Sequence, residues 1–144
     1  MFILNYKLLT FFPPYDKAAF YKLMGKFFAE RTFKNILPYL VNSPATFWYV
    51  VVDTNNVVQA FSSFEKKKGV IELGDFYESG KENTIRKIIL KKMLRDIKKE
   101  HYSVKEIRAA ANSSDEKLLL ESNGFELYKR TKNYYFLKKG NDYL

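Results

Sequence analysis

The spacing of apolar residues near the N-terminus predicts a strand followed by two helices. Residues 3–10 are largely apolar, and two prolines at positions 13 and 14 end this predicted strand. Asp16 stands where a carboxylate favours the start of a helix. A second, shorter helix is predicted from Thr32. The first helix shows apolar residues at intervals of three and four, the helical period, at Phe20, Leu23, Met24, Phe27 and Phe28.

The middle of the chain has the pattern of an antiparallel meander. Residues 47–53 are aromatic and β-branched, which favours a strand. The polar residues 53–56 predict a turn, and residues 57–65 form the expected hairpin partner. A second turn at 66–69 leads to a third strand over residues 70–77. These short connections imply that the three strands run antiparallel to one another.

The C-terminal half predicts a long helix, a strand, a short helix and a final hairpin. One apolar and one basic face mark a helix over residues 82–100, and residues 104–112 read as a strand. Ser113 and Glu116 have the spacing of a capping box, and Asn123 with Gly124 closes the short helix that follows. Residues 125–139 form the last hairpin. The order β-α-α-β-β-β-α-β-α-β-β predicts an α+β fold, a three-layer α/β/α sandwich around a mostly antiparallel, mixed sheet.

Composition narrows the chemistry that this fold can carry. The chain has 144 residues, which favours a single domain over residues 1–144. It contains no cysteine and only one histidine, His101, so thiol chemistry and a histidine-based triad or metal site are not expected. No segment approaches the roughly 20 apolar residues of a membrane span, and a cytoplasmic location is predicted. The net charge of +9 fits a solvated lysine-rich surface, a polyanionic small molecule or a nucleic acid, although no nucleic-acid-binding motif accompanies it.

Several motifs resemble those of the GNAT superfamily of acyl-CoA-dependent N-acetyltransferases. Residues 53–65 have its acidic-polar turn followed by two aliphatic residues, a small residue and an aromatic one. Asn112 ends a strand before a short helix, and Gly124 with Phe125 begins the next strand. The last strand over residues 134–139 is also similar. The resemblance covers nearly the whole chain and implies the GNAT fold.

The cofactor-binding motif of that family has a counterpart at the start of the long helix. The motif reads R/Q-x-x-G-x-G/A, and Lys81 takes its basic first position. Thr84 and Arg86 stand at the two glycine positions with Ile85 between them. A threonine hydroxyl and a guanidinium both bind phosphate, yet Arg86 could equally fill the space that the phosphates need. A capping box from Ser79 to Glu82 is the alternative that uses no ligand.

The resemblance also implies roles for residues on the neighbouring strands. Asn112 is expected to bond the pantetheine arm, and Phe76 to contact the cofactor. Glu72 is a candidate base, with Asp75 and Glu78 as further carboxylates on or beside the same strand. The family commonly carries a tyrosine acid four residues before the glycine, where this chain has leucine at position 120, so Tyr77 is the candidate substitute, with Tyr102 as another.

The function implied by the resemblance is transfer of an acyl group from acetyl-CoA, or a related acyl-CoA, to a primary amine. No metal is expected to take part. The alternative is a GNAT-fold protein without catalysis that binds a protein or a nucleic acid. The protein is expected to be a monomer or a homodimer, with no membrane partner.

Overall fold

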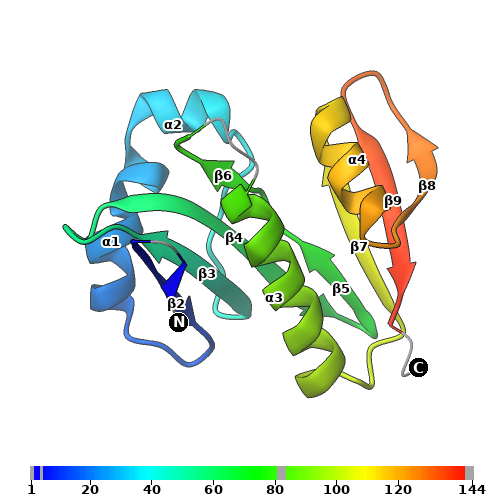
Figure 1. The fold of residues 1–144 in the computed structure, drawn as a ribbon, viewed down its shortest axis with the longest axis horizontal. Helices are drawn as coiled ribbons and strands as arrows, with labels where there is room; N and C mark the ends of the chain where they lie inside the picture. Colours follow the sequence, from blue (N-terminus) through cyan, green and yellow to red (C-terminus); the bar gives the residue numbers. More distant parts are fainter. Residues whose placement is uncertain (1, 4, 81–83, 142–144) are drawn as a thin grey trace. The chain divides into compact units, whose positions relative to one another are not determined.

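The structure is a computed structural model that describes residues 2–3, 5–80 and 84–141. Its contacts divide the chain into two compact units. The first unit comprises Met1–Phe64 and Gly74–Ile89, and the second comprises Glu65–Leu73 and Leu90–Leu144. Strand β4 and helix α3 contribute residues to both (Figure 1).

The first unit contains a largely antiparallel set of strands. Their order is β1-β2-β3-β4, and β6 pairs with β4. The first strand predicted over residues 3–10 is in fact two short strands, in which Ile3 pairs with Tyr6 across an antiparallel turn. The bounds are β1 (Phe2–Ile3), β2 (Tyr6–Phe11), β3 (Thr46–Val52), β4 (Val58–Lys67) and β6 (Tyr77–Glu78).

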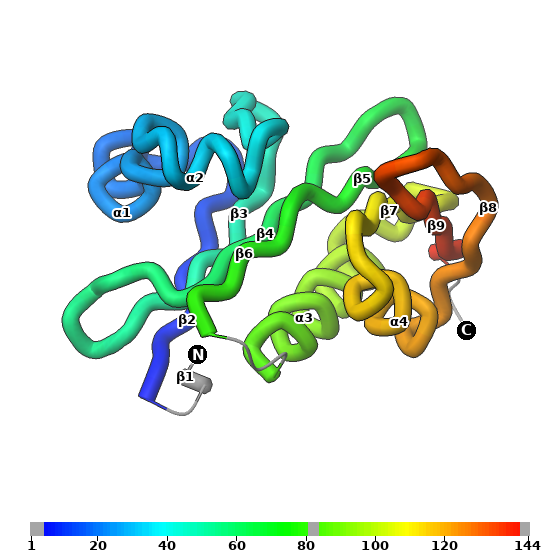
Figure 2. Tube along the Cα trace, turned by 90° about the horizontal axis from the view of Figure 1, so that it is seen from above, coloured from blue at the N-terminus to red at the C-terminus, as the bar shows by residue number. Residues whose placement is uncertain are grey.

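Helices α1 (Lys17–Ala29) and α2 (Arg31–Ile36) supply the other side of the first unit's core (Figure 2). The carboxylate of Asp16 accepts hydrogen bonds from two backbone N–H groups of the first turn of α1, as the sequence predicts for this position. The core contains the aromatic and aliphatic side chains that the helical and strand periods place on one face. These are Phe20, Met24, Phe27, Leu37, Trp48, Val50, Val52, Val58 and Phe61.

The second unit contains strands in the order β5-β7-β9-β8. Strands β5 (Val70–Leu73) and β7 (Glu106–Ala111) run parallel, because α3 carries the chain from one to the other. Strand β9 (Tyr135–Gly140) pairs antiparallel with both β7 and β8 (Glu126–Arg130). The mixed, mostly antiparallel sheet predicted from the sequence is therefore confirmed, and so is the crossover helix.

Two helices follow the expected apolar pattern and caps. Helix α3 (Thr84–Glu100) buries one face throughout its length, and α4 (Ser114–Ser122) begins at an N-cap whose Ser113 hydroxyl accepts from the Glu116 N–H. The Glu116 carboxylate does not return to Ser113, as a capping box would require, but accepts from the Asn112 N–H at 3.4 Å. The buried residues of α3 are Ile85, Ile89, Leu90, Met93 and Ile97.

Candidate functional site

A β-bulge interrupts the strand that the sequence predicts over residues 70–77. Phe61 pairs with Tyr77, so regular antiparallel pairing would place Asp75 opposite Ser63. Instead, the Gly74 N–H donates to the Ser63 carbonyl at 2.7 Å, which leaves one extra residue between Gly74 and Tyr77. The predicted third strand is therefore two strands, β5 and β6. Simple alternation of side chains does not hold across this bulge.

The bulge brings Gly74 close to the side chain of Ser63. A β-carbon on Gly74 would overlap the hydroxyl of Ser63, which is buried. The position therefore favours glycine because of close approach to the Ser63 hydroxyl rather than because of an unusual φ angle. The bulge also carries Asp75, a half-buried carboxyl whose pKa is raised by desolvation.

Most of the predicted cofactor-binding residues that belong to the first unit lie in the first turn of α3. One more, Phe76, follows Asp75 directly. The structure brings two of them together, because the Arg86 guanidinium lies 5.9 Å from the centre of the Phe76 ring. The Thr84 side chain is exposed and Ile85 is buried. No acidic residue lies in the first turn that begins at Thr84. Lys81 lies outside the described residues.

Tyr77 belongs to the aromatic core of the first unit. Its ring stacks on Phe61, with centres 5.3 Å apart and planes inclined by 24°, and meets Phe27 edge-on at 4.9 Å. Partial burial raises the pKa of the Tyr77 phenol above its usual value. A phenol keeps its proton at neutral pH even without this shift, and the protonated state is the one required of a general acid and not of a base.

In the second unit, the pairing of β5 with β7 stops before β7 ends. The register pairs Glu72 with Arg108 as its last couple, whereas β7 continues to Ala111 and remains paired with β9 on its other side. On the side of β5, residues 109–111 have no strand partner among the described residues, and this unpaired edge of β7 is flanked by small side chains because all three residues are alanine. Ligands of α/β folds bind at the carboxyl ends of parallel strands, which is where this edge lies.

Two predicted site residues lie at the carboxyl ends of these parallel strands. The Glu72 carboxylate is about half exposed and forms an ion pair with Lys67 at 3.0 Å; this hydrogen bond raises the pKa of Lys67. Asn112 follows β7 directly. Among the residues that the structure describes, its side-chain amide has no hydrogen-bond partner, since the bond to Glu116 uses the backbone N–H. Leu120, at the position of the family's tyrosine, is buried in α4.

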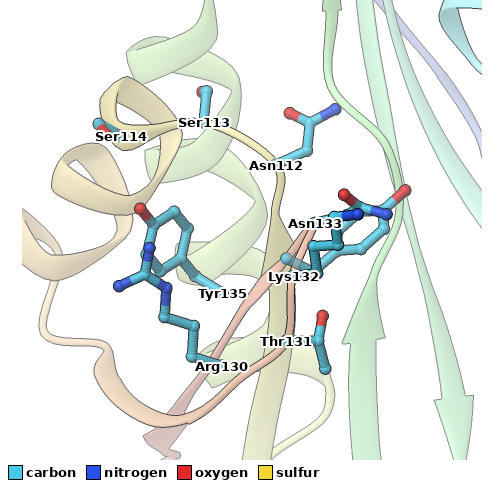
Figure 3. Close-up of a pocket in the computed structure, with 9 residues that line it drawn as sticks. Asn112, Ser113, Ser114, Arg130, Thr131, Lys132, Asn133 and Tyr135 are labelled. Carbon is cyan, nitrogen blue, oxygen red and sulfur yellow. The ribbon is translucent and has the colours of Figure 1, made fainter.

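A polar cavity of about 180 Å³ adjoins Asn112 (Figure 3). It is lined by residues 112–114, before and at the start of α4, and by residues 130–135, which connect β8 to β9. The second of these segments is not among the site residues predicted from the sequence. The sequence does contain a signal for this segment, because residues 129–133 include three basic residues around a polar hairpin turn. However, nothing in the sequence indicates that this turn reaches the end of β7.

Neither a cluster of metal ligands nor a membrane-spanning helix is found among the described residues. Within residues 2–3, 5–80 and 84–141, no group of three or more histidine, cysteine or acidic residues is placed to hold a metal ion. No helix of that same part of the chain combines the length and apolar character needed to cross a bilayer.

The fold is that of the GNAT superfamily of N-acetyltransferases, as the sequence motifs indicate. The ribosomal-protein-S5-alanine acetyltransferase of Vibrio fischeri is similar, with a TM-score of 0.72 and 14% identity over 99% of this chain and 96% of that one. An acetyltransferase of the GNAT family from Staphylococcus aureus Mu50 has a TM-score of 0.66 and 10% identity, over 95% and 99% of the two chains.

A third similar structure contains a ligand. The PaiA N-acetyltransferase of Thermoplasma acidophilum, in complex with coenzyme A, has a TM-score of 0.59 and 16% identity over 88% of this chain and 80% of that one. No protein-family model matches the chain, and no curated protein sequence does so either. The comparisons therefore establish the fold.

Proposed function

We propose that the protein is an N-acyltransferase that moves an acetyl or related acyl group from an acyl-CoA to a primary amine. The observation that carries this proposal is the unpaired edge of β7 beyond the Glu72–Arg108 couple. An extended ligand can pair with the backbone of such an edge as a short additional strand. The amide-containing pantetheine arm of coenzyme A has the required donors and acceptors, and the alanines at 109–111 leave room for it.

Asn112 is the side chain best suited to fix this arm. It lies at the end of the same edge, and its amide can donate and accept at once. A ligand amide that bonds Asn112 would therefore gain both a backbone and a side-chain anchor. We expect this residue to affect the affinity for acetyl-CoA more than the rate of transfer.

The start of α3 is proposed to hold the pyrophosphate. A helix N-terminus offers unpaired N–H groups and a partial positive charge, and the turn that begins at Thr84 contains no carboxylate to oppose an anion. The exposed Thr84 hydroxyl can donate to a phosphate oxygen. Arg86 adds positive charge from the same turn, and its contact with Phe76 orients the guanidinium. The two other residues of the proposed cofactor motif are Lys81, at its basic first position, and Ile85, between Thr84 and Arg86.

The transfer reaction assigns two further roles. The amine must lose a proton before its nitrogen attacks the thioester carbon, and Glu72 is the proposed acceptor of that proton. The C–N bond forms as the C–S bond breaks, and the departing thiolate takes a proton. Tyr77 is the proposed donor, because a phenol holds its proton at neutral pH and this residue is the candidate substitute for the tyrosine of the family. Leu120 cannot fill that role.

The proposal is tested by ligand-induced stabilisation and by turnover. Acetyl-CoA at about 100 times its Kd should stabilise the folded protein by roughly 2.7 kcal/mol, which raises the melting temperature by several degrees. The variant Asn112→Ala should require more acetyl-CoA for the same shift. Asn123→Ala is not a suitable control because its amide bonds the Leu119 carbonyl, so Asn55→Ala, in an exposed turn of the first unit, is used instead.

The outcomes separate the activity from its alternative. Release of free thiol with a primary amine, reduced in Glu72→Gln and Tyr77→Phe, supports the transferase. No stabilisation at millimolar acetyl-CoA would overturn it. Stabilisation without thiol release across a panel of amines would indicate a cofactor-binding protein that has lost catalysis, which the buried leucine at position 120 would then explain.

A further inference from the structure

The polar cavity beside Asn112 carries a strong excess of positive charge. Two of its lining residues, Arg130 and Lys132, are cationic, and none is acidic. The remaining lining side chains are amides, hydroxyls and phenols, which can donate hydrogen bonds. The nearest carboxylates in sequence are Asp115 and Glu116, in the first turn of α4. Of these, Glu116 is already engaged by the Asn112 N–H.

The guanidinium of Arg130 contacts an aromatic ring that lines the same cavity. Arg130 and Tyr135 are cross-strand partners of β8 and β9, and the guanidinium lies 5.1 Å from the centre of the Tyr135 ring. Figure 3 shows the two side chains alongside each other next to α4. A guanidinium over an aromatic ring uses none of its N–H groups in that contact. These donors therefore stay available to a ligand.

Among the described residues, no carboxylate neutralises these cations. Within the part of the chain that the structure describes, neither Arg130 nor Lys132 forms an ion pair. Other cations of the same sheet are differently placed: Arg108 and Lys138 both approach Glu106. A positively charged, donor-rich cavity of about 180 Å³ fits a small oxyanion, because guanidinium and oxyanion form charge-assisted hydrogen bonds.

We propose that this cavity binds an oxyanion, a carboxylate or a phosphate, carried by the acceptor amine. The identity of the ligand as the acceptor rests on the proposed function, whereas the oxyanion site rests on the cavity alone. Asn112 connects the two, since it lines the cavity and ends the edge of β7 assigned to the pantetheine arm. An amine anchored here by its oxyanion would lie beside the acyl group. The substrate class is thus a small amine that carries negative charge.

The experiment compares amines that differ in the oxyanion. The full-length protein, labelled with nitrogen-15, is titrated at constant ionic strength with O-phosphoethanolamine, with β-alanine and with propylamine, which lacks an oxyanion. Backbone signals of residues 131–135 and the side-chain amides of Asn112 and Asn133 report binding. We expect saturable shifts with one or both anionic amines and none with propylamine. The anionic amine that binds with the higher affinity identifies the oxyanion as phosphate or carboxylate.

Matched variants assign the binding to the cavity. Arg130→Gln should lower the affinity for the anionic amine by about tenfold, which is the effect of losing a charged hydrogen bond. Arg130→Lys should recover part of this, because charge returns without the planar fork. Lys129→Gln is the control: it removes the same charge from the same strand, but Lys129 lies outside the cavity, over the ring of Phe136. All of these side chains are exposed, and melting temperatures verify folding.

Four results would overturn the proposal or separate it from the proposed function. Equal shifts with propylamine, or an equal loss in Lys129→Gln, would overturn the oxyanion site. If Arg130→Gln lowered the affinity for acetyl-CoA but not the affinity for the anionic amine, the cavity would belong to the cofactor. This result would also overturn the oxyanion site. Saturable binding of the anionic amine that Arg130→Gln weakens, in a protein that acetyl-CoA does not stabilise, would overturn the transferase and leave the oxyanion site standing.

Discussion

Replacing Gly74 with alanine tests whether close approach to Ser63 shapes the bulge between β5 and β6. The added methyl group would overlap the Ser63 hydroxyl, and overpacking of this kind costs about 1–3 kcal/mol. Alanine also restricts the unfolded chain, which returns about 0.4–1 kcal/mol. The expected net loss in the free energy of unfolding is therefore about 1–2 kcal/mol. For 144 residues this lowers the melting temperature by roughly 3–6 °C.

A double-mutant cycle isolates the contact. The Ser63 backbone lies at ordinary contact distance from the new methyl group, at 3.5 Å or more, so Ser63→Ala removes the conflict. In that background, Gly74→Ala should be neutral or slightly stabilising, which gives a coupling of about 1–3 kcal/mol. Urea unfolding followed by the fluorescence of Trp48, the single tryptophan and fully buried in the same unit, measures each corner. A coupling near zero would refute this account of the bulge.

Three further predictions concern stability. Asp16→Ala should cost about 1 kcal/mol in urea unfolding because α1 loses its N-cap, whereas Asp16→Asn should cost much less; equal losses would contradict the capping role. Burial raises the pKa of Asp75, so the wild-type protein loses stability as pH rises through the folded-state pKa. The melting temperature of Asp75→Asn relative to wild type should therefore increase from about pH 3 to about pH 7, and a constant difference would refute the burial effect. If residues 1–144 form a single domain, Trp48 fluorescence and far-ultraviolet circular dichroism should give coincident unfolding transitions; separate midpoints would show that the two units unfold independently.

The local signals in the sequence were sufficient for the order of elements. Asp16 and Ser113 cap helices as their positions predict, and the apolar period of residues 85–97 corresponds to the buried face of α3. These features depend on neighbours within one or two turns, so a single sequence contains the information. The GNAT motifs added the fold, because their order along the chain matches that of the superfamily.

The bulge could not be predicted, because an extra residue in a strand depends on the register with a partner. The composition of residues 70–77 favours one continuous strand, and only the bond from Gly74 to Ser63 shows that pairing shifts by one residue. The same reason explains the error at residues 3–10, where pairing of Ile3 with Tyr6 divides an apolar run into two strands. Register is set by atoms from distant segments, and periodicity within one segment does not contain it.

The sequence by itself determined the helices, most strands and which residues resemble a cofactor motif. The tertiary structure decided where pairing between β5 and β7 ends and which side chains gather beside Asn112. Arg130 and Lys132 lie about twenty residues farther along the chain, and the antiparallel pairing of β8 and β9 with β7 brings their hairpin to that strand end. Hydrogen bonds between strands act across any distance in sequence, so chemistry that depends on them emerges only from the folded chain.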